Sequence, residues 1–124
     1  MINFVELSPF SKSVLAWIKK IPKGKVATYK QIATLAGKEH GSRGVAWILK
    51  SCSRKYRLPW HRVLSSYGRI SFDSKTHNFR EQKKRLASEG VIVDTAGNLN
   101  LDKFQWKKFP PKPKRIRGQP KMFS

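Results

Sequence analysis

The strongest constraint on the fold is a pair of helix starts placed close together in the first half of the chain. Thr28 and Gln31 have the spacing of a capping box, in which each side chain satisfies a free backbone amide at the other residue. Apolar residues follow at helical spacing as far as Gly37, a residue type that commonly ends helices. The pattern predicts a short helix of about two turns.

A second helix start follows after a brief connection, residues 38–41. Ser42 is in a position to cap it, and Val45, Leu49 and Cys52 lie at the spacing of one helical face. Cys52 is expected to be a buried packing thiol on that face. Two short helices joined by a glycine-containing turn in a basic chain indicate a helix-turn-helix.

Two further helices are expected on either side of this pair. One begins at Ser8, where a capping hydroxyl precedes Pro9, and ends before Pro22. The other is highly charged, contains Phe79 and closes at Gly90.

In the second half of the chain, short extended segments replace the helical period. Residues 63–64 and 70–72 flank a glycine-containing turn, and residues 91–93 and 99–101 flank another. Both pairs are typical of β-hairpins. The expected fold class is therefore mainly α-helical with small β-hairpins, a winged-helix-like helix-turn-helix domain.

The charge of the chain narrows the class of partner. Lys and Arg total 27 against 7 Asp and Glu, a formal net charge of +20. Such a balance favours a polyanion, because each neutralised phosphate releases counterions. Nucleic acid is the leading partner class, and RNA or ribosome binding has the same support from charge. A membrane is not expected as a partner, since no apolar run approaches the roughly 18 to 20 residues that a span requires.

The end of the chain differs in composition from the rest. Residues 103–124 carry 8 basic side chains and no acidic one, with several prolines. Proline and charge leave little to bury, which predicts a disordered cationic arm. We expect a DNA-binding domain over residues 1–108 and a basic tail over residues 109–124.

Cysteine usage and the start of the chain indicate an intracellular protein. The single cysteine, Cys52, excludes an internal disulfide and a cysteine metal cluster. The histidines have no companions at metal-ligand spacing, so no metal and no cofactor are predicted. No export signal is visible at the start, which predicts the cytoplasm or nucleoid of a bacterium, or the nucleus of a eukaryote.

Residues 58–63 carry the most specific motif, Leu-Pro-Trp-His-Arg-Val. It resembles the Pro-Cys-His-Arg-Val active-site motif of O6-alkylguanine-DNA alkyltransferases, with Trp60 in the place of the cysteine, and that replacement is the signature of alkyltransferase-like proteins. Further blocks of that family are matched in order and spacing. They are residues 21–29, 42–45, 68–71, 89–91 and 101–106.

The resemblance implies a DNA damage sensor that is not an enzyme. Alkyl transfer needs a thiolate, and an indole offers only an N–H donor and a π face. The implied protein is a monomer that binds duplex DNA containing O6-alkylguanine through the minor groove. It flips the damaged base into a pocket containing Trp60 and flags it for nucleotide excision repair proteins.

The alternative is a general helix-turn-helix DNA-binding or nucleoid protein without lesion selectivity, in which charge alone provides affinity. It predicts equal binding to damaged and undamaged duplexes. An active alkyltransferase is a further alternative, against which the missing nucleophile argues directly.

The resemblance also assigns residues. Tyr29 is expected to push on the target phosphate, and Arg43 to fill the gap left in the base stack. Arg43 has independent support, because a cation in the first turn of a helix opposes the helix dipole. The DNA-binding candidates are Tyr29, Ser42, Arg43, Gly44 and Lys50. The candidates for the lesion pocket are Tyr29, Trp60, His61, Arg62, Ser71 and Phe72, and His61 with Glu89 is expected to form a structural pair.

Two positions depart from the family pattern. Cys52 stands where alkyltransferases often carry an asparagine that braces the active-site loop. Asp73 stands where some alkyltransferase-like proteins place a basic side chain against the flipped base, a role for which Lys75 and Arg69 are the expected substitutes.

Overall fold

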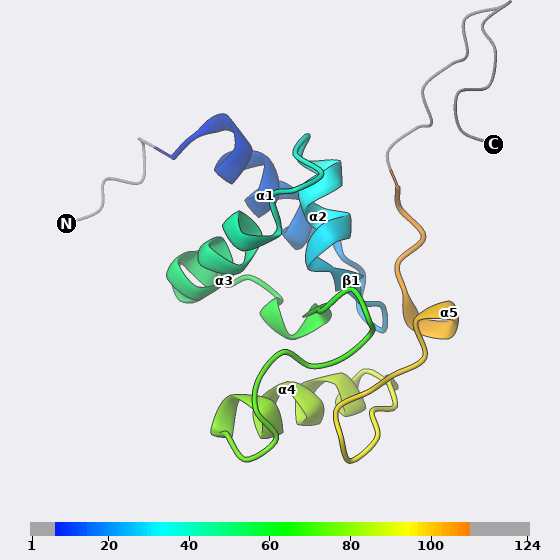
Figure 1. Ribbon diagram of the computed structural model, residues 1–124. Coiled ribbons are helices and arrows are strands. Elements are labelled where there is room, and N and C mark those ends of the chain that lie inside the picture. The colour runs from blue at the N-terminus through cyan, green and yellow to red at the C-terminus, as the bar shows by residue number, and fades with distance from the viewer. Residues whose placement is uncertain (1–6, 110–124) are drawn as a thin grey trace, which may run out of the picture.

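Helices make up most of the structure, a computed structural model that describes residues 7–109 (Figure 1). The predicted tail therefore lies outside the described residues, apart from Phe109. The elements in chain order are α1 (Pro9–Lys20), β1 (Ala27–Thr28), α2 (Tyr29–Leu35), α3 (Ser42–Tyr56), the 3-10 turn η2 (Trp60–Arg62), β2 (Val63–Leu64), α4 (His77–Ser88) and α5 (Leu101–Phe104). The expected fold class, mainly helical with a helix-turn-helix, is confirmed.

The first three helices pack around one apolar core. The Ser8 hydroxyl accepts a hydrogen bond from the Ser11 amide at 3.1 Å and Pro9 opens α1, as predicted. The core side chains come from all three helices and include Val14, Ile18, Ile32, Val45, Ile48 and Cys52. Burial of Cys52 at 1% exposure confirms its predicted packing role.

The capping box at the start of α2 is present in both directions. The Gln31 amide donates to Thr28 Oγ1 at 3.0 Å, and the Thr28 amide donates to Gln31 Oε1 at 3.3 Å. Gln31 has a second role that its spacing does not reveal. Its Nε2 donates to the carbonyls of Trp106 and Lys108 at 2.7 and 2.8 Å, which ties the chain beyond α5 to α2.

The prediction that Ser42 caps α3 is wrong by one residue. Ser42 is already helical, and the N-cap is Gly41, with no side-chain cap. A Cβ at Gly41 would lie 2.8 Å from the Phe10 ring of α1. The close approach of this turn to α1 thus leaves no room for a capping side chain.

The two predicted hairpins are wrong. Residues 63–64 form β2, which pairs in parallel with β1 through Ala27 opposite Val63 and Thr28 opposite Leu64. The following segment pairs elsewhere, as the Ile70 amide donates to the Gly97 carbonyl at 2.9 Å. Leu101 begins α5 and is not in a strand. Period-2 alternation marks extended backbone but carries no information about its partner.

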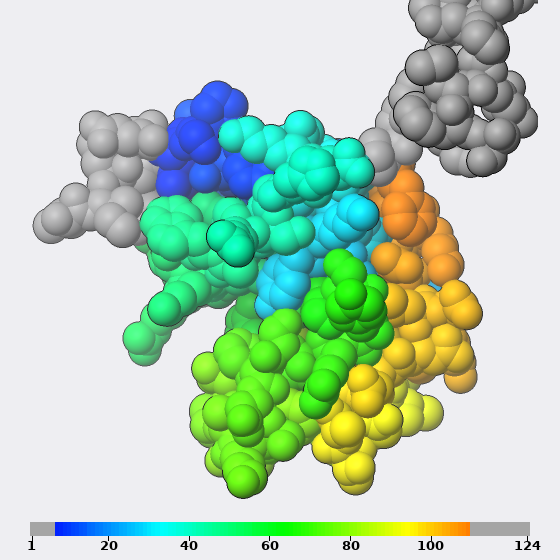
Figure 2. Space-filling view, in the orientation of Figure 1, coloured from blue at the N-terminus to red at the C-terminus, as the bar shows by residue number. Residues whose placement is uncertain are grey.

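A second core joins α4 to the two-stranded sheet. It contains Val26, Leu64, Ile70, Phe79, Leu86 and Val91. α4 ends just before Gly90, as predicted, and its N-cap is Thr76, which the sequence analysis does not name. In Figure 1, α4 lies below the three helices α1, α2 and α3. The space-filling view shows a notch between α3 and α4 (Figure 2). None of the helices within residues 7–109 is long and apolar enough to cross a membrane.

Candidate functional site

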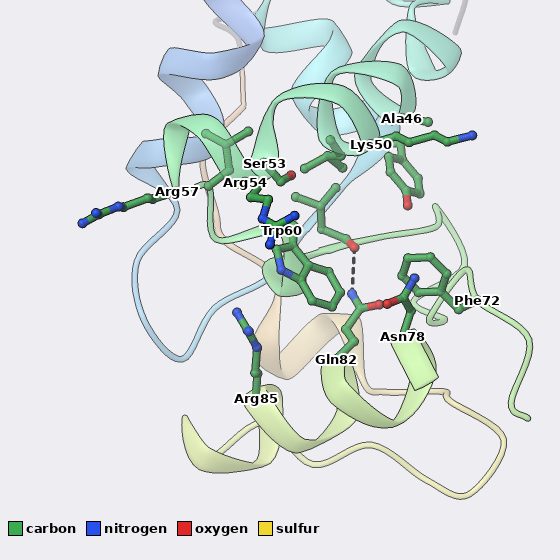
Figure 3. A pocket seen from close by; sticks show the side chains of 14 residues that line it. Ala46, Lys50, Ser53, Arg54, Arg57, Trp60, Phe72, Asn78, Gln82 and Arg85 are labelled. Atoms are coloured by element: carbon green, nitrogen blue, oxygen red, sulfur yellow. Dashed lines mark hydrogen bonds between the residues drawn. The ribbon is translucent and has the colours of Figure 1, made fainter. Parts of the chain in front are cut away.

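The notch between α3 and α4 opens into a cavity of about 890 Å³ (Figure 3). Its walls come from α2, α3, η2, the loop after β2, and α4. The lining residues are Tyr29, Ala46, Leu49, Lys50, Ser53, Arg54, Arg57, Leu58, Trp60, Val63, Phe72, Asn78, Gln82 and Arg85.

Trp60 is the central aromatic of this cavity. Pro59 precedes the tight turn η2, in which the Arg62 amide donates to the Pro59 carbonyl at 3.0 Å. The indole meets the Phe72 ring edge to face, with centroids 6.1 Å apart. The Arg85 guanidinium lies 5.3 Å from the indole centroid, within the range of a cation–π contact.

Gln82 of α4 fixes the turn that presents Trp60. Its Nε2 donates to the His61 carbonyl at 3.0 Å and to the Val63 carbonyl at 3.1 Å. The residue is 1% exposed. Because both neighbours are acceptors, they determine which end of the carboxamide carries the nitrogen. The sequence analysis does not name Gln82, although its spacing from Phe79 and Leu86 places it on the buried face of α4.

Behind Trp60, Glu89 holds the motif residues His61 and Arg62. Its carboxylate accepts from His61 Nε2 at 2.8 Å and from Arg62 Nη2 at 2.7 Å. It also accepts from the Gly24 amide at 3.0 Å. Arg62 Nη1 donates in turn to the Ile21 carbonyl at 2.9 Å. The cluster thereby ties the turn η2 to the end of α4 and to the loop after α1.

The environment sets the charges within this cluster. Burial alone would raise the pKa of Glu89, but the hydrogen bonds from Arg62, Gly24 and His61 lower it to about 2. Burial lowers the pKa of His61 and outweighs the opposing effect of Glu89. At neutral pH, His61 is therefore neutral and donates its Nε2 proton to the Glu89 carboxylate.

The predicted pocket residues divide into two groups. Tyr29, Trp60 and Phe72 line the cavity, whereas the residues 61 and 62 of the motif face Glu89, and Ser71 is exposed outside the lining.

The predicted DNA-binding residues lie mainly on α3. Ser42 and Arg43 stand at its start, and Lys50 lines the cavity. Gly44 faces α1, since a Cβ there would lie 2.8 Å from the Phe10 ring. Close packing against Phe10 thus explains why position 44 carries no side chain.

Four basic side chains line the cavity, and Lys50 is the one among them that the sequence analysis names. Lys75 and Arg69, the expected substitutes for the cation missing at Asp73, do not line it. Asp73 Oδ1 accepts from the Lys75 amide at 2.9 Å in the turn before α4. The cations that line the cavity are Lys50, Arg54, Arg57 and Arg85 (Figure 3). Arg85, from α4, is the one with a ring contact to Trp60 among the described residues.

In the part of the chain that the structure describes, neither a cysteine nor a metal site accompanies the cavity. Cys52, the single cysteine of the sequence, lies in the core, and burial raises the pKa of its thiol. Between residues 7 and 109, no three His, Cys, Asp or Glu side chains are grouped as metal ligands.

Comparisons with known proteins agree with one another. The model of the 6-O-methylguanine DNA methyltransferase DNA-binding domain matches residues 9–91. The DNA base-flipping protein of Vibrio parahaemolyticus is 38% identical over 100 residues, which cover 81% of this chain and 98% of that protein. Alkyltransferase-like protein 1 of Schizosaccharomyces pombe is 34% identical over 107 residues, which cover 83% and 99%. The crystal structure of S. pombe Atl1 in complex with damaged DNA containing O6-carboxymethylguanine matches with a TM-score of 0.72 over 83% of this chain and 99% of that one.

Proposed function

The chain belongs to the family of the 6-O-methylguanine DNA methyltransferase DNA-binding domain and, within it, to the alkyltransferase-like proteins, and on this premise we propose that it is a non-catalytic sensor of alkylated DNA. It binds duplex DNA as a monomer through the minor groove and turns an O6-alkylguanine out of the base stack. It then marks the site for nucleotide excision repair. This role places it inside the cell, with the DNA.

The observation that carries the proposal is the cavity beside Trp60. Its volume of about 890 Å³ is in the range of ligand pockets. Trp60 and Phe72 give it apolar aromatic surfaces, and Tyr29 of the helix-turn-helix lies on its wall. A base that leaves the stack next to α2 and α3 therefore has an aromatic pocket within reach.

Lesion selectivity follows from the chemistry of the base. Alkylation at O6 removes the N1 proton of guanine and weakens pairing, so an alkylated guanine costs less to flip than a normal one. The added alkyl group also gains from burial against aromatic surface. Arg43, at the start of α3, would occupy the vacated position in the stack, while Tyr29 presses on the target phosphate.

The same cavity argues against alkyl transfer. Trp60 offers no thiolate, and the buried Cys52 lies in the core, outside the cavity lining. His61, which would assist a thiol in an active enzyme, is held by Glu89 in a structural cluster. The protein should therefore bind the lesion and release it unchanged.

A competition titration tests the proposal. Two duplexes that differ only in one O6-methylguanine or guanine compete for the protein at one salt concentration near physiological. We expect tighter binding to the lesion, and we expect Trp60→Ala and Arg43→Ala each to reduce the preference by about 10-fold. Arg80→Ala, on an exposed arginine of α4 outside the cavity, is the matched control and should keep the preference.

Two outcomes would contradict the proposal. Equal affinity of the unmodified protein for both duplexes would identify a general DNA-binding protein. Transfer of the methyl group to the protein, detected by mass spectrometry after incubation with the lesion duplex, would identify an enzyme.

A further inference from the structure

One face of α3 presents an aromatic side chain among cations. At about 100° per residue, Arg43, Trp47, Lys50 and Arg54 fall within an arc of about 60°. All four are exposed. The buried side chains of the helix, Val45, Ile48 and Cys52, lie on the opposite side.

Trp47 contributes little to the fold. Its side chain is 48% exposed, and it belongs to neither apolar core. The other three tryptophans, at positions 17, 60 and 106, are each partly buried and have ring contacts. Within residues 7–109, Trp47 has no ring–ring or cation–π contact of this kind. Tryptophan is enriched at binding interfaces, so an exposed indole surrounded by cations on one helix face is a candidate contact residue.

The charges around Trp47 specify the partner. α3 carries four basic residues and no acidic one within Ser42–Tyr56. A basic surface with an aromatic at its centre fits a polyanion that also exposes apolar surface between its charges. Duplex DNA has this chemistry, since the deoxyribose rings form apolar walls between successive phosphates in the minor groove.

We propose that Trp47 is a DNA-contacting residue that packs its indole on the deoxyribose wall of the minor groove, beside the nucleotide that leaves the stack. Lys50 and Arg54, one and two turns further along α3, lie beside the phosphates. The inference rests on the proposed function only in placing α3 against DNA. It does not require selectivity for a lesion, because undamaged DNA presents the same sugar wall.

Salt dependence separates an apolar contact from an ionic one. Each phosphate contact contributes about 0.9 to the slope of log affinity against log salt, and an indole on a sugar contributes nothing to it. Trp47→Ala should therefore weaken binding to both guanine and O6-methylguanine duplexes by about 5-fold or more at every salt concentration, with an unchanged slope. Lys50→Gln should reduce the slope by about 1.

Two further variants sharpen the test. Trp47→Phe should recover most of the affinity, because it keeps an aromatic face. Tyr67→Ala, which removes a 92% exposed aromatic from the turn after β2, is the matched control and should bind like the unmodified protein. Circular dichroism melting should show an unchanged fold for Trp47→Ala, since the side chain lies outside both cores.

Three results would overturn the inference. Unchanged DNA affinity of Trp47→Ala would show that the indole does not contact DNA. A changed salt slope would show that its loss disturbs the cations. An effect confined to the lesion duplex would place its action in the cavity. Failure of the proposed function gives a different result, equal affinity of the unmodified protein for both duplexes.

Discussion

At the scale of single residues, Gln82 controls the position of Trp60. Its two hydrogen bonds to backbone carbonyls, at 3.0 and 3.1 Å, join α4 to the turn η2. Gln82→Met should keep the volume but leave both carbonyls without this partner, at a cost of about 2 kcal/mol. Urea unfolding should show this loss, and the preference for O6-methylguanine should fall with it. Asn78→Ala, on the same cavity wall, is the control, and equal stability of the two variants would contradict the role of Gln82.

Glu89 makes the free energy of unfolding depend on pH in the acidic range. Its pKa is about 2 in the fold against 4.5 ordinarily, so the unfolded chain binds the proton more tightly. The stability from its carboxylate is therefore complete above about pH 4.5 and is lost as the pH falls toward about 2. Glu89→Gln should be about 3 kcal/mol less stable than the unmodified protein at pH 7.

The difference between these two proteins should narrow as the pH falls from about 4.5 toward about 2. Urea unfolding of both proteins at each pH measures it, and comparing them cancels the general repulsion of a chain with a net charge of +20. Glu81→Gln, which removes an exposed pair with Arg85, should stay close to the original stability at every pH. A gap that stays constant with pH would contradict the assignment.

At the scale of elements, the capping box decides whether α2 starts at the right residue. Thr28→Ala leaves the Gln31 amide without its partner and should cost about 1 kcal/mol in urea unfolding. Thr28→Ser keeps the hydroxyl oxygen and should recover most of that loss. Thr34→Ala is the control on the same helix. The Thr34 hydroxyl donates to the Lys30 carbonyl within the helix and does not cap a free backbone amide. A loss as large at Thr34 as at Thr28 would argue against the cap.

Local signals explain which elements could be predicted from the sequence. Caps and glycine stops lie within a few residues of the helices they bound, so α1, α2 and α4 were predicted. Strand partners are distant in sequence, and β2 pairs with β1, which lies 36 positions earlier by the register of Ala27 and Val63. The alternation of apolar and polar residues does not show which strands pair, so the extended segments were predicted to form hairpins with their neighbours in sequence.

At the scale of the whole molecule, the site combines residues that a sequence motif identifies with residues that only the packing of α4 brings to the cavity. Trp60 and Tyr29 lie in matched blocks of sequence, and the cavity contains both. Gln82 and Arg85 come from α4, which lies outside the motif. Gln82 shares the buried face of that helix with Phe79 and Leu86, but helical spacing does not tell which part of the chain this face meets. The cation beside Trp60, Arg85, is therefore a residue that the motif could not indicate.

The basic tail adds charge to a molecule that already binds DNA through its body. Residues 110–124 hold five of the basic side chains, at positions 112, 114, 115, 117 and 121. If they meet phosphates, changing all five to Gln should lower the affinity for any duplex and reduce the salt slope by up to about 4.5. The preference for O6-methylguanine over guanine should not change, because the cavity lies within residues 29–85. Titrations of both duplexes at several salt concentrations measure the two quantities separately. An unchanged slope would show that the tail does not touch DNA, and a lost preference would show that it helps to form the lesion site.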